Sequence, residues 1–230
     1  MKIGGIQKFS TSDYPGVTSF VVFTPGCNFD CWYCYNRKTL LTKNVDEYDE
    51  NEVLEMISKR KKLLQGVVIS GGECTLQKDL IDFIYKIKNI GMKVKVDSNG
   101  INPFVIKQLC GLGIVDYFAI DYKCSFFNYN KLCGKSANPD LLKETLLILH
   151  NYSVNYEIRT TLIPDISGNE LIQMSMELDN VVPRWVLKRF IPDEIDKNVL
   201  DNHIDKYNLY FNINKYIHTI LEYQPNTIII

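Results

Sequence analysis

Short apolar runs alternate along this chain with longer stretches of helical periodicity. Six apolar runs rich in β-branched and aromatic residues predict strands over 18–24, 66–70, 93–99, 115–121, 155–163 and 184–190. Five stretches have apolar residues at the three- and four-residue spacing of an amphipathic helix: about 50–64, 80–90, about 102–110, 140–152 and 169–179. The chain therefore reads as a series of strand–helix units.

Strand, helix and strand at these intervals indicate parallel strands joined by crossover helices. Six units fit in 230 residues, where a full eight-unit barrel of about 250 residues would be tight. We therefore expect an α/β fold, a partial (β/α)6 TIM-like barrel, with a doubly wound sheet as the alternative. We expect one domain over 1–230, with a core of about 17–192 and a C-terminal extension of unknown role over 193–230. Within it, 208–230 predicts either a helix and an edge strand or a docking surface.

Composition excludes several functional classes. With 26 Lys and Arg against 27 Asp and Glu, the net charge is −1, so nothing draws the whole chain to nucleic acid or to a membrane. The densest basic run, 58–62, is typical of the solvated end of a helix rather than of a nucleic-acid site. The N-terminus does not resemble a signal peptide, and the apolar runs are too short to span a bilayer. We expect a soluble cytoplasmic protein without nucleic-acid or membrane partners.

Seven cysteines, an odd number, do not suggest a disulfide framework, and in a reducing compartment clustered thiols are expected to bind metal or do redox chemistry. Three of them, Cys27, Cys31 and Cys34, lie within "PGCNFDCWYC" (25–34), after the first predicted strand. Three thiolates can hold a [4Fe–4S] cluster and leave one iron open to an outside ligand. The alternative, a structural zinc site, would need a distant fourth ligand. We predict small buried fillers for the others, Cys74, Cys110, Cys124 and Cys133.

The stretch "CNFDCWYC" resembles the signature of the radical S-adenosylmethionine superfamily. This resemblance implies that Cys27, Cys31 and Cys34 ligate a [4Fe–4S] cluster, with S-adenosylmethionine on the fourth iron and Tyr33 beside its adenine. In such enzymes one electron from the cluster cleaves the cosubstrate to methionine and a 5′-deoxyadenosyl radical, which takes a hydrogen atom from the substrate. The cofactor carries the chemistry, so we name no catalytic side chain.

The second predicted strand ends in "SGGE" (70–73). Taken alone, Gly71, Gly72 and Glu73 fit a tight strand-to-helix turn as well as a ligand site. Glycines let the backbone approach a ligand closely, and the Glu73 carboxylate can accept from an ammonium or a ribose hydroxyl. After the cysteine loop, the stretch looks like the second motif of the superfamily, in which the glycines hold the methionine amino group.

Two further strands end in acidic residues, in "VDSNG" (96–100) and "IDYK" (120–123). On their own these could be a helix cap and a surface charge pair. Together they resemble the "DTNG" and "DLK" stretches of glycyl-radical-enzyme activases. The resemblance implies a monovalent-cation site made by Asp97, Ser98 and Asp121, since hard oxygen ligands suit such a cation, and cosubstrate neighbours at Asn99 and Lys123.

Arg159 lies within the apolar stretch "YEIRTTLIP" of the fifth predicted strand. A buried guanidinium needs an anionic partner, because burying an unpaired charge is expensive. One partner would be a nearby Asp or Glu. The resemblance favours instead the methionine carboxylate of the cosubstrate, which a guanidinium can hold in a fork.

Four further stretches are "MKIGGIQKFSTSDYPG", "VVFTPGCNFDCWYCYN", "VVISGGECTLQKDL" and "RTTLIP". Together they resemble the anaerobic ribonucleoside-triphosphate reductase activating proteins, and the similarity covers most of the chain, from residue 1 to about 192. This similarity implies installation of a glycyl radical on that reductase, with flavodoxin or ferredoxin as electron donor. Three differences from the activase pattern leave open which substrate receives the radical. Tyr35 stands where activases often have His, Cys74 replaces the commoner Pro or Ala, and "KRFIPDEID" lacks a histidine.

Two alternative functions are a radical enzyme acting on a small molecule or peptide, and a non-enzymatic iron–sulfur carrier. Deazapurine synthases usually have "GEG" before the cluster loop, where this chain has "DYPG", and peptide modifiers often add cysteines after the core, whereas none follows Cys133. A carrier would need a closed cluster with four ligands, but not the glycine motif or Arg159. We therefore expect a glycyl-radical-enzyme activase.

Overall fold

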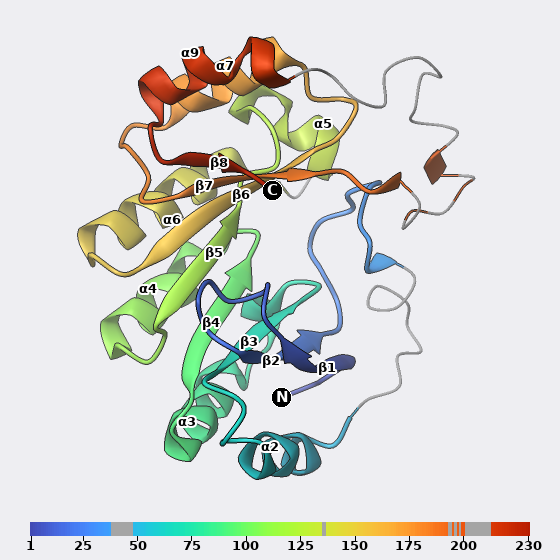
Figure 1. The fold of residues 1–230 in the computed structure, drawn as a ribbon, viewed down its shortest axis with the longest axis vertical. Coiled ribbons are helices and arrows are strands. Elements are labelled where there is room, and N and C mark those ends of the chain that lie inside the picture. Colours follow the sequence, from blue (N-terminus) through green and yellow to red (C-terminus); the bar gives the residue numbers. More distant parts are fainter. Residues whose placement is uncertain (38–47, 135–136, 193–194, 196, 198, 201–212) are drawn as a thin grey trace. The chain divides into compact units, whose positions relative to one another are not determined.

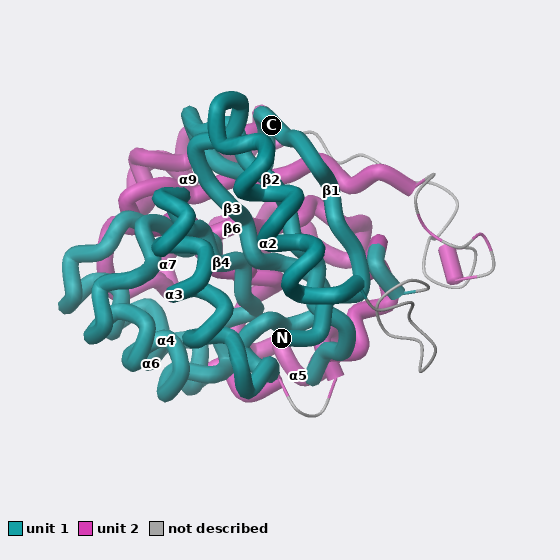
Figure 2. Tube along the Cα trace, turned by 90° about the horizontal axis from the view of Figure 1, so that it is seen from below, with its two compact units in different colours: residues 1–28, 36–119, 140–155 teal, residues 29–35, 120–139, 156–230 magenta. Residues whose placement is uncertain are grey.

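The computed structural model describes residues 1–37, 48–134, 137–192, 195, 197, 199–200 and 213–230 (Figure 1). The chain forms two compact units that interleave in sequence, coloured separately in Figure 2. Unit 1 contains residues 1–28, 36–119 and 140–155, and unit 2 contains residues 29–35, 120–139 and 156–230. The cysteine loop therefore begins in unit 1 and continues in unit 2.

Unit 1 is built on parallel strands with one antiparallel strand at the edge. Strand β1 (Gly5–Ser10) pairs antiparallel with β2 (Ser19–Thr24), and parallel pairing joins β2 to β3 (Gly66–Gly71) and β3 to β4 (Lys93–Ser98). The helices connected to these strands are α2 (Glu50–Lys59), α3 (Leu80–Ile90), α4 (Pro103–Leu112) and α6 (Pro139–Asn151). Strand β5 (Tyr117–Asp121) begins in unit 1 and ends in unit 2.

Local sequence explains where these elements begin and end. Both faces of β2 are buried, as expected for a parallel strand covered on both sides. The Asp49 carboxylate caps α2 by accepting from the backbone N–H groups of Asn51 and Glu52. Helix α3 ends at Gly91, whose φ of 89° is left-handed and suits a glycine C-cap.

Unit 2 has three parallel strands in sequence order, β6 (Tyr156–Leu162), β7 (Trp185–Arg189) and β8 (Thr227–Ile229). Its helices are α5 (Tyr129–Cys133), α7 (Gly168–Glu177) and α9 (Ile217–Tyr223), and α7 packs against α9 (Figure 1). Three short 3₁₀ turns complete the described elements: η1 (Cys74–Leu76) in unit 1, and η2 (Phe126–Asn128) and η4 (Ile213–Lys215) in unit 2.

The structure confirms the α/β class and the parallel strands. Each of the six predicted strands corresponds to one of β2 to β7, and each of the five predicted helices is present. Strand β1 was not predicted, and α2 ends at Lys59, earlier than expected. The predicted helix and edge strand near the C-terminus are α9 and β8, while 208–212 of that stretch lie outside the described residues.

Candidate functional site

The cysteine loop follows directly from the end of β2. None of the seven cysteines, all of which lie in the described part of the chain, forms a disulfide. Cys27 and Cys34 are partly exposed and Cys31 is buried, with Cys27 in unit 1 and the other two in unit 2. Within unit 2, the Cys34 N–H donates to the Cys31 carbonyl at 3.2 Å. Among the described residues, no group of three or more His, Cys, Asp or Glu side chains is arranged around a metal position.

The glycine turn after β3 lies against the start of the cysteine loop in unit 1. The Gly72 N–H donates to the Thr24 carbonyl at 2.8 Å, and the Asn36 side chain donates to the Gly71 carbonyl at 3.5 Å. Gly71 has a φ of 125°, which favours glycine. A Cβ at Gly72 would overlap the carbonyl oxygen of Gly26. Both glycines are therefore needed for this close approach of two backbone segments.

The Glu73 carboxylate joins this turn to the end of β4. It is buried and accepts from the Thr75 N–H (3.1 Å), the Thr75 hydroxyl (2.6 Å), the Ser98 hydroxyl (2.8 Å) and the Asn99 N–H (2.7 Å). Burial raises the pKa of Glu73 above its usual value, although these donors oppose the rise. Glu73 thus binds protein groups within unit 1, and a direct contact with the cosubstrate stays a prediction.

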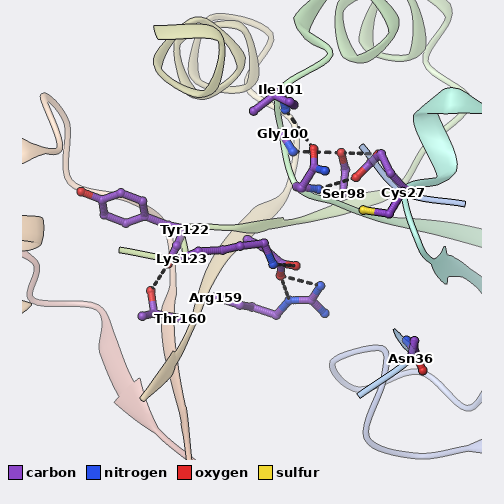
Figure 3. A network of polar contacts seen from close by, with 12 residues as sticks. Cys27, Asn36, Ser98, Gly100, Ile101, Tyr122, Lys123, Arg159 and Thr160 are labelled. Atoms are coloured by element: carbon purple, nitrogen blue, oxygen red, sulfur yellow. Dashed lines mark hydrogen bonds and ion pairs between the residues drawn. The ribbon is translucent and has the colours of Figure 1, made fainter. Parts of the chain in front are cut away.

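Asn99 connects the same network to the cysteine loop. Its Nδ2 donates to Asn28 Oδ1 at 2.7 Å, and the Cys27 thiol lies 3.9 Å from that oxygen. The turn after β4 is held by two more hydrogen bonds, from the Gly100 N–H to the Ser98 hydroxyl and from the Ile101 N–H to Asn99 Oδ1 (Figure 3). Hydrogen bonds therefore connect the start of the cysteine loop, the glycine turn after β3 and the turn after β4 into one network within unit 1.

Asp97, predicted as a cation ligand, already has a positively charged neighbour. Lys95 Nζ lies 2.5 Å from Asp97 Oδ1, and the Lys95 side chain is fully buried. The Ser98 hydroxyl, another predicted ligand, donates to Glu73 instead. No sequence motif marked Lys95, although its position two residues before Asp97 places both side chains on one face of β4.

In unit 2, the predicted residues Asp121, Lys123 and Arg159 form one ionic cluster (Figure 3). Lys123 Nζ lies 3.0 Å from Asp121 Oδ2, and Asp121 Oδ1 accepts from Arg159 Nη2 at 3.0 Å and Nε at 3.2 Å. Burial would raise the pKa of Asp121, but Lys123 and Arg159 lower it well below its usual range. The Asp121 carboxylate likewise keeps the pKa of Lys123 well above its usual value, against the effect of burial.

Tyr33, predicted to lie beside the adenine, is buried in unit 2, and its ring centroid is 6.0 Å from Lys123 Nζ. Tyr35, where activases often have His, stacks on Phe190 with an interplanar angle of 18°. Its hydroxyl accepts from the Ile191 N–H at 3.0 Å. The segment after β7 thus supports the cysteine loop through Tyr35, a contact with no signal in the sequence.

The four remaining cysteines are all buried, as expected for small fillers. Burial raises the pKa of the Cys74 thiol, which donates to the Asp97 carbonyl at 3.2 Å. The Cys133 carbonyl accepts from the Asp30 N–H at 3.1 Å and so anchors the cysteine loop within unit 2. These positions favour structural roles for Cys74 and Cys133.

The family model described as the radical SAM superfamily matches residues 21–177. This match covers more than half of the chain, so the chain belongs to the radical SAM superfamily. The superfamily implies a [4Fe–4S] cluster and S-adenosylmethionine. Three thiols on one loop are a suitable donor set for such a cluster, and the glycine turn leaves no room for a Cβ beside that loop.

Several curated relatives are named as activating enzymes, and two of them illustrate the range of similarity. The chain is 34% identical over 199 residues to "Putative glycyl-radical enzyme activating enzyme MJ1227" of Methanocaldococcus jannaschii, which covers 84% of this chain and 81% of that protein. It is 31% identical over 102 residues to the pyruvate formate-lyase-activating enzyme of Streptococcus mutans, which covers 42% of this chain and 38% of that protein. The longer of these matches reaches well beyond the cysteine loop.

Among solved structures, the chain resembles Streptococcus suis SuiB bound to the precursor peptide SuiA. The TM-score is 0.65 at 13% sequence identity, over 91% of this chain and 48% of SuiB. At this identity the likeness shows the fold alone, which is the partial barrel of radical SAM enzymes. The expected partial barrel is therefore confirmed. No helix in the described residues is both long and apolar enough to span a membrane.

Proposed function

We propose that this radical SAM enzyme installs a glycyl radical on a partner enzyme, with anaerobic ribonucleoside-triphosphate reductase as that partner. The observation that carries the proposal is the 34% identity, over 84% of this chain, to a protein named as a glycyl-radical enzyme activating enzyme. Because that match covers 84% of this chain and 81% of that protein, it extends well beyond the cysteine motif.

The residues of the chain have distinct roles in this proposal. Cys27, Cys31 and Cys34 are the cluster ligands. Gly71 and Gly72 bring backbone groups close to the cysteine loop, where they can bind the amino group of the cosubstrate. The other predicted cosubstrate neighbours are Tyr33, Glu73, Asn99, Lys123 and Arg159.

Charge favours binding of a carboxylate in unit 2. Lys123 and Arg159 each carry +1 and Asp121 carries −1, so the cluster of these three side chains has a net charge of +1. The three side chains are largely buried, with side-chain exposures of 16%, 14% and 31% respectively, so the excess charge is only partly screened by water. A guanidinium fork and this excess charge suit the methionine carboxylate of S-adenosylmethionine.

When bound and reduced, the cluster and S-adenosylmethionine supply a 5′-deoxyadenosyl radical together with methionine. The protein has to orient the cosubstrate and keep water and oxygen away. One electron enters from a low-potential donor, for which flavodoxin or ferredoxin is expected. One hydrogen atom would pass from the α-carbon of the partner's glycine to that radical, which becomes 5′-deoxyadenosine, and the glycine would keep the unpaired electron.

A second candidate is a radical SAM enzyme that acts on a small molecule or a peptide. Tyr35 favours it, because this residue stands where activases often have His and is held by Phe190 and Ile191. The first candidate remains preferred, since the activase relative matches four-fifths of both chains.

The test is an anaerobic assay that measures cosubstrate cleavage and the glycyl radical on the partner. The protein is reconstituted with iron and sulfide, reduced with dithionite and mixed with S-adenosylmethionine, with and without the anaerobic ribonucleotide reductase of the same organism. We expect 5′-deoxyadenosine and, on the reductase, a glycyl doublet in electron paramagnetic resonance, in equal amounts. Cys34→Ala should lose most of the iron and both signals, whereas Cys110→Ala should retain them.

The outcomes separate the two candidates. A reductase whose glycine is replaced by alanine should give no doublet with the unchanged enzyme. Cosubstrate cleavage without a doublet on the unaltered reductase would contradict the activase proposal and favour the small-molecule or peptide candidate. Normal cleavage by Cys34→Ala would contradict the assignment of the cluster ligands.

A further inference from the structure

Lys95 is a fully buried lysine in the middle of β4. Its side chain has 0% exposure, and its Nζ lies 2.5 Å from Asp97 Oδ1, while the Asp97 side chain is 9% exposed. In the β-ladder, Lys95 is opposite Val68 of β3, and its neighbours Val94 and Val96 are also buried. An ammonium group in such an apolar strand is tolerated only with a close carboxylate.

Such a pair contributes little net stability. The desolvation of two charges offsets most of their attraction, and apolar side chains of similar size often do as well or better. The Lys88–Asp116 pair of the same unit shows a different arrangement. Its side chains are 31% and 34% exposed, with Nζ 2.8 Å from Oδ2. The complete burial of Lys95 therefore suggests a role in fixing the position of Asp97.

Asp97 lies where the motifs of unit 1 meet. Its carbonyl accepts from the Cys74 thiol at 3.2 Å, and Ser98 and Asn99, which follow it, both donate to Glu73. Glu73 follows the glycine turn, and Asn99 also donates to Asn28 next to Cys27. A shift of Asp97 would therefore reach the glycine turn and the cysteine loop through short hydrogen bonds.

We propose that Lys95 is a positioning residue whose ammonium serves as a built-in monovalent cation for Asp97. It neutralises the carboxylate that the sequence predicted to bind a free cation, and it fixes the end of β4 in the arrangement that binds the cosubstrate. The carboxylate of Asp121 is likewise paired in its own unit, by Lys123 and Arg159. The enzyme therefore needs no potassium or sodium ion at Asp97. This inference rests on binding of S-adenosylmethionine and not on the identity of the partner.

Three variants test the role of the ammonium. Lys95→Ala removes the charge and leaves a cavity next to Asp97. Lys95→Met removes the charge but fills the cavity with an apolar chain of similar length. Lys88→Ala is the matched control, because it removes a lysine from an ion pair of the same unit whose side chains are about one-third exposed.

The first measurement uses the full chain without cluster or cosubstrate. Melting temperatures are recorded in potassium, sodium, ammonium, methylammonium and choline chloride at one ionic strength. We expect the unaltered protein and Lys88→Ala to give the same value in every salt. Lys95→Ala should melt about 10 °C lower in choline chloride and recover at least half of the loss in ammonium or methylammonium chloride. Lys95→Met should show no such recovery.

The second measurement is the affinity of the cluster-loaded, unreduced protein for S-adenosylmethionine. Lys95→Ala should bind about tenfold more weakly in choline chloride and regain affinity with the small ammonium ions. A tenfold dependence of the unaltered protein on potassium or sodium would overturn the inference. So would equal recovery of Lys95→Ala and Lys95→Met, which would indicate a general salt effect.

A double variant keeps the inference testable if the single variants do not fold. Lys95→Met with Asp97→Leu removes both charges of the pair, so neither charge is left behind after loss of the other. We expect a melting temperature near that of the unaltered protein and cosubstrate affinity reduced about tenfold or more. Unchanged affinity in this variant would make the pair purely structural. If Lys95→Ala recovers stability and affinity in ammonium salts but the unaltered protein activates no reductase, only the proposed function is contradicted.

Discussion

At the scale of single residues, two carboxylates of the site region, Asp97 and Asp121, form ion pairs within their own unit. Asp97 has Lys95 at 2.5 Å, and Asp121 has Lys123 and Arg159, each at 3.0 Å. These side chains are at most 31% exposed, so their charges interact more strongly than on the surface. The protonation state of each carboxylate therefore influences both the stability and the binding properties of its unit.

Asp121 gives a prediction for the dependence of stability on pH. Its pKa is lowered in the folded state, so its ion pairs stabilise the protein above about pH 4, the usual Asp value. This contribution is lost as the pH falls below 4 toward the lowered pKa. Asp121→Asn should reduce the free energy of unfolding at pH 7 by about 1–3 kcal/mol, and the difference should narrow below pH 4.

Urea unfolding of the cluster-free protein between pH 3 and pH 7 checks this expectation. Asp140→Asn is the control, because Asp140 is 79% exposed and forms a surface pair with Lys143. Its effect should stay below about 0.5 kcal/mol at every pH. A difference between Asp121→Asn and the unaltered protein that is as large at pH 3 as at pH 7 would rule out this linkage.

Where spacing alone defines the chemistry, the sequence permits a specific prediction. The spacing of Cys27, Cys31 and Cys34 predicts a cluster with an open iron; the family match shows the superfamily, and the assignment of these three ligands stays a prediction. Partners that depend on three-dimensional packing were harder to predict. Lys95 was missed because a lysine among valines in an alternating strand has the appearance of a solvent-facing residue. Arg159 was expected to need an anion, but its pairing with Asp121 depends on how β5 and β6 are placed.

At the scale of elements, the turn after β3 is shaped by the loop after β2. The Glu73 N–H donates to the Gly26 carbonyl at 2.8 Å, and the Gly72 N–H donates to the Thr24 carbonyl at the same distance. No other residue type can replace Gly72 without moving one of the two segments. The turn and the start of the cysteine loop therefore act as one structural element.

Gly72→Ala should consequently weaken the binding of iron at the cysteine loop, although Gly72 lies in a different turn. The added methyl would overlap the Gly26 carbonyl, so we expect a loss of about 1–3 kcal/mol in stability and weaker retention of iron. Gly111→Ala in α4 is the control, since its Cβ would meet only the Tyr152 hydroxyl at 3.7 Å. That change should be neutral or stabilising by up to about 1 kcal/mol. Equal iron content in the two variants would contradict the structural dependence of the cysteine loop on the glycine turn.

Helices and strands were predicted correctly where hydrophobic periodicity was strong. The prediction failed for the edge strand of the sheet and for the C-terminal end of one helix. The predicted helix over 80–90 matches α3 at both ends, because an apolar face runs to Ile90 and Gly91 stops it. Strand β1, "GIQKFS", was missed because three of its six residues are exposed and it pairs on one side with β2. Helix α2 ends at Lys59, since a turn begins at the basic run and leaves Leu63 exposed.

At the scale of the whole molecule, ligand binding should stabilise the folded chain. S-adenosylmethionine is expected to bind the folded chain and not the unfolded chain, so its binding favours folding over unfolding. For the cluster-loaded, unreduced protein, S-adenosylmethionine at 100 times its dissociation constant should add about 2.7 kcal/mol. For a chain of this size, that corresponds to a rise of about 5–10 °C in melting temperature.

Arg159→Ala should reduce this rise, because the excess positive charge near Asp121 is lost with the guanidinium. At the same cosubstrate concentration, a tenfold loss of affinity leaves about 1.4 kcal/mol, or a rise of about 3–5 °C. Arg184→Ala is the matched control, since Arg184 of the same unit pairs with Glu157 and is 38% exposed. It should keep the full rise. Equal rises in the two variants would return Arg159 to the structural ion pair with Asp121, and the carboxylate of the cosubstrate would then need another partner.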